Sequence, residues 1–391
     1  MTKRLYYTDS YLTQFEARIV EVGDDGQRIY LDRTAFYPTS GGQPFDLGAL
    51  GGIPVTDVVD EGDRVAHILS APLAVPPGPI QAQIDWTRRF DHMQQHTGQH
   101  LLSAIFLEHL HAETISFHLG ALSATIDLKM ESLEVAAVQE VERRANEMVC
   151  ENRPVAVEFR DAGSAAADLR KASDREGTLR IVSIHGLDRS ACGGTHVRLT
   201  GEIGPILIRK LDKVRGNVRV EFVCGGRAVQ RARADYDALS KIGRAFSAPL
   251  DDTPELLTAL LERAAESDKT ARRLSAELAA ARGRELYAQT QPDPDGVRRV
   301  TKRLDTMTEE ARAEAQSFTA GAKAVMLMAV ANPPSVLLAA SKDSGFNAGA
   351  WLKTAFSQIG GKGGGSATLA QGGLPTQAAL EMVIDRFRTG V

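Results

Sequence analysis

Four side chains able to bind a metal ion are gathered in two short motifs that lie far apart along the chain. His96 and His100 fall in a stretch that continues into the apolar residues 101–106, a pattern that predicts a helix. Residues four apart share one face of a helix, so both imidazoles can reach a single ion. Cys192 and His196 flank two glycines and a threonine, where the absent glycine side chains let the backbone fold closely around a metal. This ligand set suits Zn²⁺, so the first hypothesis is a zinc site at these four residues.

His92 lies on the same predicted helix face and makes the choice of ligand pair ambiguous. With a rise of 1.5 Å per residue, His92 and His100 are about 12 Å apart along the axis and cannot share one ion. The pair is therefore either His92 with His96 or His96 with His100, and spacing alone does not decide. A single pair of this kind often has a structural role, so the prediction depends on the two motifs occurring together.

The motif His-Thr-Gly-Gln-His-Leu-Leu at residues 96–102, followed by Cys-Gly-Gly-Thr-His at residues 192–196, resembles the editing domain of alanyl-tRNA synthetase and the free-standing AlaX proteins. A third motif, Phe-Tyr-Pro-Thr-Ser-Gly-Gly-Gln-Pro at residues 36–44, is similar to the Gly-rich motif of that family and stands in the same order. The resemblance implies that the ligand pair is His96 with His100. It also implies that all four predicted ligands act in catalysis at the metal.

The same resemblance implies that residues in and near the Gly-rich motif contact the substrate. A threonine there is expected to read a serine hydroxyl, with Thr34 preferred to Thr39, and Gln43 is expected to contact the acceptor end of the RNA. Two alternatives stay open, because Gly41-Gly42 could be a bend in a barrel strand and His118 could be a strand histidine that faces water. The predicted substrate-binding residues are Thr34, Thr39, Gly41, Gly42, Gln43 and His118.

The bulk composition is that of an ordinary globular protein, with 43% hydrophobic and 25% charged residues among 391. This length suggests two or three domains. No apolar run approaches the roughly 20 residues needed to cross a membrane, and no apolar signal core follows Met1. Only three cysteines occur, which excludes a disulfide framework and favours the cytoplasm. Of these, Cys150 is expected in the core of a helical region and Cys224 is expected to be structural.

Charge is distributed unevenly although the net charge is only −4. Between residues 207 and 219, five basic residues face a single acid, Asp212. This segment is either a solvated hairpin or a patch that contacts phosphate groups. The predicted tRNA-binding residues are Arg209, Lys210, Lys213 and Arg215, with Lys362 near the C-terminus.

The elements that position these residues are predicted from their periodicity, and the fold class is α+β. Residues 1–85 are expected to form a small β-barrel-like domain, because short alternating segments are separated by turn residues. Residues 86–240 are expected to form an α+β zinc-binding editing domain. There the ligands from a helix and from a loop after a strand meet in one cleft.

The last third of the chain changes in composition. Residues 250–320 are rich in Ala, Glu, Arg and Leu, and they predict a helical hairpin whose second helix spans 297–318. Its simplest role is a spacer or a dimer arm. Residues 321–391 predict a compact α/β domain, and the glycine run at 360–366 resembles the DHH-associated domain of alanyl-tRNA synthetases. That resemblance implies dimerisation and contact with tRNA, with Lys362 as a phosphate contact.

Together these features predict a long-form AlaX protein, an aminoacyl-tRNA deacylase that edits tRNA(Ala) mischarged with serine or glycine in trans. No aminoacylation region is expected ahead of the barrel. Two alternatives stay open, an editor of another aminoacyl-tRNA and a zinc-stabilised RNA-binding or dimerisation protein without catalysis. Four protein ligands would close a tetrahedral site, whereas catalytic zinc usually keeps one position open. Either one ligand, such as His196, is loosely held, or the coordination expands, or the metal mainly positions the substrate.

Overall fold

The computed structural model describes residues 1–73, 78–165, 169–171 and 177–389. It divides into two compact units, Met1–Lys241 and Ile242–Val391, each with its own core. The finer division into four domains stays a prediction. Among the described helices, none combines the length and the apolar character that crossing a membrane requires.

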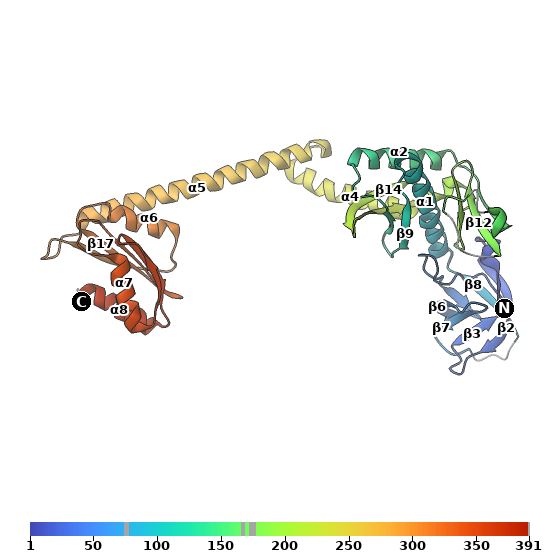
Figure 1. The fold of residues 1–391 in the computed structure, drawn as a ribbon, viewed down its shortest axis with the longest axis horizontal. Coiled ribbons are helices and arrows are strands. Elements are labelled where there is room, and N and C mark those ends of the chain that lie inside the picture. The colour runs from blue at the N-terminus through green and yellow to red at the C-terminus, as the bar shows by residue number, and fades with distance from the viewer. Residues whose placement is uncertain (74–77, 166–168, 172–176, 390–391) are drawn as a thin grey trace. The chain divides into compact units, whose positions relative to one another are not determined.

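The first unit begins with a closed six-stranded barrel (Figure 1), which confirms the barrel-like fold predicted for this region. Side chains alternate between the two faces, so that Phe15, Ala17 and Ile19 of the first barrel strand fill the interior. A short parallel pair, β1 (Lys3–Arg4) with β4 (Arg33–Thr34), flanks the barrel. In hydrogen-bonding order the barrel strands are β2 (Gln14–Val22), β3 (Arg28–Leu31), β7 (Val65–Leu69), β6 (Ile53–Asp60), β5 (Gly48–Leu50) and β8 (Pro79–Ile84).

Helix α1 (Trp86–Leu110) leaves the barrel directly after β8 and carries the first motif. Asp85 caps its start by accepting a hydrogen bond from the backbone N–H of Arg88, and His111 ends it in a left-handed conformation. Every residue from Gln95 to Phe106 is buried. A helix that is buried on all sides holds its side chains rigidly, because each is packed against a neighbouring element.

Two sheets and a second helix surround α1. Helix α2 (Val135–Cys150) buries the predicted face formed by Val138, Val141, Ala145 and Met148. The four-stranded sheet has the order β14 (Ile206–Val214), β15 (Asn217–Cys224), β10 (Ala124–Leu128) and β9 (Thr114–Leu119). The three-stranded sheet has the order β11 (Val155–Asp161), β12 (Thr178–Ile184) and β13 (Asp188–Ala191), with the short α3 (Ala162–Ala165) after β11. Cys192 follows β13 directly, and α4 (Gly225–Phe246) follows β15.

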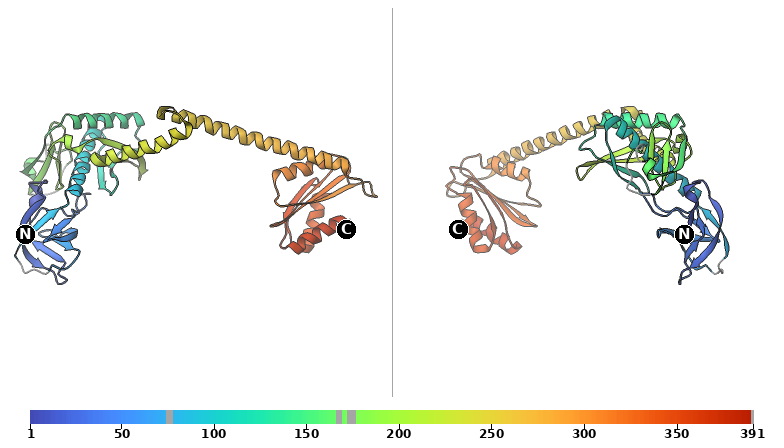
Figure 2. Two further views of the ribbon diagram at one scale, coloured as in Figure 1. Left: turned by 180° about the vertical axis from the view of Figure 1, so that it is seen from behind. Right: turned by 45° about the vertical axis from the view of Figure 1, so that its right-hand side comes forward.

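The second unit is a five-stranded sheet with helices on both faces (Figure 2). Helices α7 and α8 cover one face, and α6 with the end of α5 covers the other. The sheet order is β16 (Arg298–Leu304), β17 (Ala324–Ala331), β18 (Pro334–Ala340), β20 (Leu369–Gly373) and β19 (Lys362–Gly365). The helices are α5 (Thr253–Gln289), α6 (Glu309–Phe318), α7 (Ala348–Ile359) and α8 (Gln377–Thr389).

The second helix of the hairpin expected over 250–320 is wrong in its first part, whereas its last part is helical as α6 (Glu309–Phe318). Residues 253–289 form one continuous helix, but Arg298–Leu304 is a strand that pairs in parallel with β17. The β-branched Val300 and Thr301 suit a strand, and Val300 packs against the core beneath α6. Pairing with β17, a long-range contact, therefore outweighs the helix-forming residues around this segment.

Candidate metal centre

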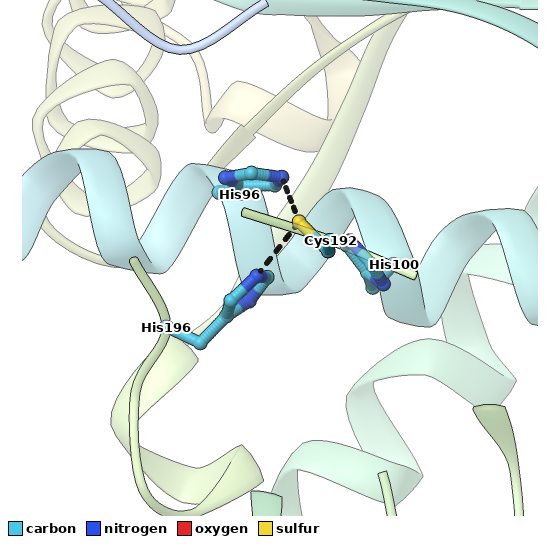
Figure 3. Close-up of side chains that lie close together, drawn as sticks. All are labelled: His96, His100, Cys192 and His196. Atoms are coloured by element: carbon cyan, nitrogen blue, oxygen red, sulfur yellow. Dashed lines mark hydrogen bonds between the residues drawn. The ribbon is translucent and has the colours of Figure 1, made fainter. Parts of the chain in front are cut away.

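The four predicted ligands meet in one cluster, although they come from segments about ninety residues apart (Figure 3). His96 and His100 project from α1, and Cys192 and His196 come from the loop after β13. One ligand atom from each lies within 4.8 Å of the other three. The three imidazoles are 3–4% exposed, and Cys192 is partly buried.

The two distances from the Cys192 sulfur to histidine nitrogens fit the donor spacing of a tetrahedral ion. The sulfur of Cys192 lies 3.5 Å from Nε2 of His96 and 3.3 Å from Nε2 of His196. Around Zn²⁺, with bonds of about 2.0–2.3 Å, neighbouring donors of a tetrahedron are separated by about 3.4–3.7 Å. One soft thiolate with three imidazoles is also a donor set that zinc prefers. The cluster could therefore bind a metal, and its chemistry fits zinc.

Nδ1 of each histidine, the ring nitrogen that does not face the sulfur, lies within hydrogen-bonding distance of an oxygen atom. Nδ1 of His96 lies 2.8 Å from Oε1 of Gln43, and Nδ1 of His100 lies 2.9 Å from a carboxylate oxygen of Asp188. Nδ1 of His196 lies 3.2 Å from the hydroxyl of Thr97. An oxygen acceptor at Nδ1 favours the tautomer with its proton there, which leaves the Nε2 lone pair free for a metal.

Close contact requires one of the two glycines of the second motif, Gly194. A side-chain carbon at Gly194 would lie 2.1 Å from Cε1 of His96, whereas one at Gly193 would meet only the ring of Tyr7, at 3.7 Å. The neighbouring Thr195 fixes Gln43, since its hydroxyl accepts from the Gln43 amide and its backbone N–H donates to Oε1. The turn thus packs directly against one ligand and orients the group that holds it.

The electrostatics of the cluster favour a negatively charged sulfur. Burial raises the pKa of Cys192, but the imidazoles of His96 and His196 outweigh this and hold it well below its usual range. Burial lowers the pKa of His100, but its hydrogen bonds to Asp188 and Cys192 raise it to about 9. Burial lowers the pKa of His196 to about 3. A divalent ion would thus bind a thiolate and displace a proton from His100.

Several residues that contact the cluster belong to no motif that would identify them from the sequence. Asp188 is buried and also accepts hydrogen bonds from Arg170, at 2.7 Å, and Ser190. Arg180 is buried and donates to the carbonyl of Cys192 at 2.6 Å and to the carbonyl of Tyr7 at 2.9 Å. These contacts join residues distant in sequence, so only the fold reveals them.

His92 is not part of the cluster, which agrees with the pair implied by the resemblance. It lies one helical turn before His96 and is 3% exposed. Burial lowers its pKa to about 3, so the imidazole is neutral near pH 7. In the described part of the chain, its Nδ1 has no hydrogen-bond partner.

The predicted substrate residues occupy different environments. Gln43 is fully buried against His96, whereas His118 is exposed on β9 beside Phe117, whose ring stacks on His96 at 5.2 Å. Gly42 has a φ of 86°, and a side-chain carbon there would lie 2.5 Å from the carbonyl oxygen of Phe117. Gly41 also has a positive φ, 57°, but faces open space.

The hydroxyl groups of the two predicted threonines, Thr34 and Thr39, already contact hydrogen-bonding partners within the protein. The hydroxyl of Thr34 is fully buried, lies 2.8 Å from Nε2 of His67 and accepts the backbone N–H of Phe36. The hydroxyl of Thr39 accepts the backbone N–H of Phe45 at 3.1 Å. Contact of either threonine with a substrate stays a prediction.

The predicted tRNA-binding residues lie at surfaces of both units. Arg209 and Lys210 on β14 form ion pairs with Asp235 and Asp212 respectively. Lys213 and Arg215 are exposed near the β14–β15 turn, and Lys362 is exposed on β19 in the second unit. Among the cysteines, Cys224 is buried as expected, but the expected burial of Cys150 is wrong, because it is exposed at the end of α2.

Comparison with known proteins gives matches along the whole chain. Residues 179–221 match the family described as the threonyl and alanyl tRNA synthetase second additional domain, and residues 312–389 match the DHHA1 domain. The chain is 32% identical to the alanyl-tRNA editing protein AlaX-L of Pyrococcus horikoshii, over 100% of this chain and 99% of that protein. It is 32% and 33% identical to the alanine–tRNA ligases of Methanoregula boonei and Halorubrum lacusprofundi, over 98% of this chain. It spans only 43% of the length of each ligase.

Proposed function

The chain belongs to the family of the alanyl-tRNA editing protein AlaX-L, and on this premise we propose that it hydrolyses tRNA(Ala) charged with serine or glycine. The proposed cofactor is Zn²⁺, held by His96, His100, Cys192 and His196. The observation that carries the proposal is this cluster of one thiolate and three imidazoles, each imidazole fixed through its Nδ1 atom.

A separate hydrolase is needed because binding alone discriminates poorly between small amino acids. One methylene or hydroxyl group changes the binding free energy in a pocket by about 1–3 kcal/mol, which leaves too many errors for translation. A second site that removes the wrong amino acid supplies the missing selectivity. The proposed reaction answers this need without any aminoacylation step.

The reaction is hydrolysis of an ester. Water adds to the carbonyl carbon, the bond from that carbon to the ribose oxygen breaks, and the ribose oxygen takes a proton. The amino acid leaves as a carboxylate and releases its proton to solvent. A bound Zn²⁺ supplies Lewis-acid chemistry, since it polarises a carbonyl and lowers the pKa of water. The residues of this chain hold the ion, fix the tautomers of its ligands and exclude bulk water around them.

We infer that His196 would be the most weakly held of the three histidine ligands of a bound ion. Its Nδ1 contact to Thr97, at 3.2 Å, is longer than the corresponding contacts of His96 and His100, at 2.8 and 2.9 Å. The Thr97 hydroxyl is also shared with the backbone N–H of Val197. A more weakly held ligand can move with the loop, whereas both ligands of α1 are fixed by a buried helix.

The remaining contacts complete the proposal. Thr34, Thr39, Gly41, Gly42, Gln43 and His118 are proposed to form or support the pocket for the aminoacyl end. The phosphate backbone of the RNA is proposed to contact Arg209, Lys210, Lys213, Arg215 and Lys362. A homodimer formed through the C-terminal region is part of the same proposal.

The test is deacylation of Ser-, Gly- and Ala-tRNA(Ala) by protein that has been stripped of metal and then reloaded with zinc. We expect the reloaded protein to release serine or glycine rapidly and alanine slowly, and the stripped protein to release none at a catalysed rate. Equal release of all three amino acids, or release that does not depend on metal, would contradict the proposal.

A further inference from the structure

A cavity of about 810 Å³ opens beside the first turns of α1 in the first unit. Its walls come from four segments: the start of α1, Pro44 at the end of the Gly-rich motif, the turn after β9, and the start of α4. This volume lies within the range of sites that bind small molecules or parts of larger ones. None of the four metal-binding residues lines it, so it is a separate compartment.

The cavity and the metal cluster are neighbours. His92 lines the cavity and precedes His96 by one helical turn, about 6 Å along the axis. Pro44, also in the wall, directly follows Gln43, whose Oε1 lies 2.8 Å from Nδ1 of His96. A ligand that fills the cavity can therefore extend one end towards the cluster.

One wall carries an exposed aromatic ring. The Trp86 side chain is 37% exposed, and its ring lies against Phe90 at 5.1 Å and against Tyr11 at 5.3 Å. These two contacts hold the indole in place and leave one surface open to a ligand. A fixed, exposed indole suits stacking with a nucleobase, because every base has a π-face.

The charges around the cavity favour an anionic group near Arg88. Arg227 is bound to Asp91 by two hydrogen bonds, at 2.8 and 2.6 Å, so these two charges neutralise each other. Arg88 donates through Nε to the carbonyl of Phe45 at 3.0 Å and forms no ion pair within the described residues. The carboxylate of Asp85 accepts the backbone N–H of Arg88 at the start of the helix. Arg88 is thus a cation still able to contact a phosphate.

His92 provides a buried polar group in the wall of the cavity. The residue is 3% exposed, and its Nδ1 has no partner among the described residues. A buried polar nitrogen without a partner is unfavourable, so a ligand group that bonds to it gains binding free energy. A ribose hydroxyl, which both donates and accepts hydrogen bonds, can satisfy either tautomer.

We propose that this cavity binds the single-stranded 3′ end of the aminoacylated tRNA. A base stacks on Trp86, a phosphate contacts Arg88, and the terminal ribose lies towards His92, which brings the ester to the metal cluster. The inference rests on the proposed function, because it assigns a position to that substrate. It explains how one site accepts a long RNA while only its end reaches the metal.

Binding can be measured without catalysis, because Trp86 and Trp351 are the only tryptophans in the chain. The Trp351→Phe variant leaves Trp86 as the sole indole, and Trp351 lies in the other unit. We expect a short RNA that carries no amino acid and ends in an unpaired CCA to quench the Trp86 fluorescence saturably. A blunt hairpin RNA should leave this fluorescence unchanged. Arg88→Gln in the same background should weaken the binding about tenfold. Absence of quenching by the CCA-ended RNA would overturn the inference.

Kinetics give the second readout. Trp86→Ala is expected to raise KM for Ser-tRNA(Ala) about tenfold, with kcat changed less than about threefold and zinc content unchanged, because stacking serves binding. Trp86→Phe, which keeps a ring, should recover most of the loss. An unchanged KM in Trp86→Ala would contradict the inference while leaving the deacylase proposal intact. Quenching by the CCA-ended RNA in a protein with no deacylase activity would support the binding site and contradict the proposed reaction.

Discussion

At the scale of single residues, the cluster is organised by the contacts behind its ligands. Three imidazoles can face one sulfur because Gln43, Asp188 and Thr97 each lie within hydrogen-bonding distance of an Nδ1 atom. These oxygen acceptors come from the barrel loop, from β13 and from α1 itself. The fold therefore gathers four side chains that could bind a metal and places an oxygen atom behind each imidazole.

Asp188→Asn tests the contact behind His100. The amide keeps the size of the carboxylate but removes its charge, so His100 loses the group that fixes its tautomer and raises its basicity. We expect zinc affinity to fall by about 10- to 100-fold, measured by competition with a coloured chelator. Asp127→Asn, which alters an ion pair with Arg219 on the sheet, is the matched control and should keep the wild-type affinity.

The two glycines of the second motif give a sharper comparison. Gly194→Ala would place a carbon 2.1 Å from His96 and must displace that ligand, whereas Gly193→Ala meets its nearest atom at an ordinary 3.7 Å. We expect Gly194→Ala to lose most of its zinc and Gly193→Ala to retain it, measured by metal analysis of purified protein. Equal zinc content in both variants would show that the packing of this turn does not matter.

At the scale of elements, α1 is the part that the sequence specifies best. The i,i+4 spacing of His96 and His100 and the apolar run behind them predict both the helix and the face that carries two residues of the cluster. The buried face of α2 is equally predictable from its spacing. The burial expected for Cys150 is wrong, because this residue lies about 200° around the helix from Met148 and is exposed. Strand β16 escaped prediction because its pairing partner, β17, lies beyond the next helix.

The residues behind the ligands were beyond sequence reasoning for a similar reason. Asp188 belongs to no motif in the sequence, and only the packing of β13 against α1 brings it to His100. Gln43 was predicted to contact RNA, whereas the structure adds a contact with His96 that no local pattern encodes. Motif spacing specifies which side chains can bind a metal, and tertiary contacts decide what holds them.

The barrel contains a buried histidine whose protonation should set its acid stability. His67 is fully buried, and burial lowers its pKa to about 4, whereas the unfolded chain binds the proton near pH 6.5. The unfolded state binds more protons between these values, so stability should be complete above pH 6.5 and decrease as pH falls towards 4. At pH 5 the expected loss is about 2 kcal/mol in the free energy of unfolding.

Urea unfolding at several pH values measures this effect when His67 and His67→Gln are compared in the Trp351→Phe background, with the fluorescence of Trp86, at the start of α1, as the probe. The variant should be less stable at pH 7, because it disturbs the contact with Thr34, but its stability should depend less on pH between 4 and 6.5. Parallel pH dependence in the two proteins would exclude His67 as the source.

At the scale of the whole molecule, the chain has two units with separate cores, and only the first contains the metal cluster. Metal binding stabilises a fold by its affinity for the native state, so its removal should loosen only the unit that holds it. We expect a chelator to speed hydrogen exchange in peptides covering α1 and residues 188–196. Peptides from β17 and β18 should exchange unchanged, and equal acceleration in both units would contradict this expectation.

The measurement that tests the central claim most directly compares two cysteine variants for deacylation of Ser-, Gly- and Ala-tRNA(Ala). Cys192→Ala removes a proposed ligand, whereas Cys150→Ala removes an exposed thiol outside the cluster. The proposal predicts that Cys192→Ala loses both its zinc and its deacylation of Ser- or Gly-tRNA(Ala). Cys150→Ala should keep its zinc and this activity, and like wild type it should deacylate Ala-tRNA(Ala) only slowly. Full deacylation by a zinc-free Cys192→Ala protein, or none by a zinc-loaded wild type, would contradict it.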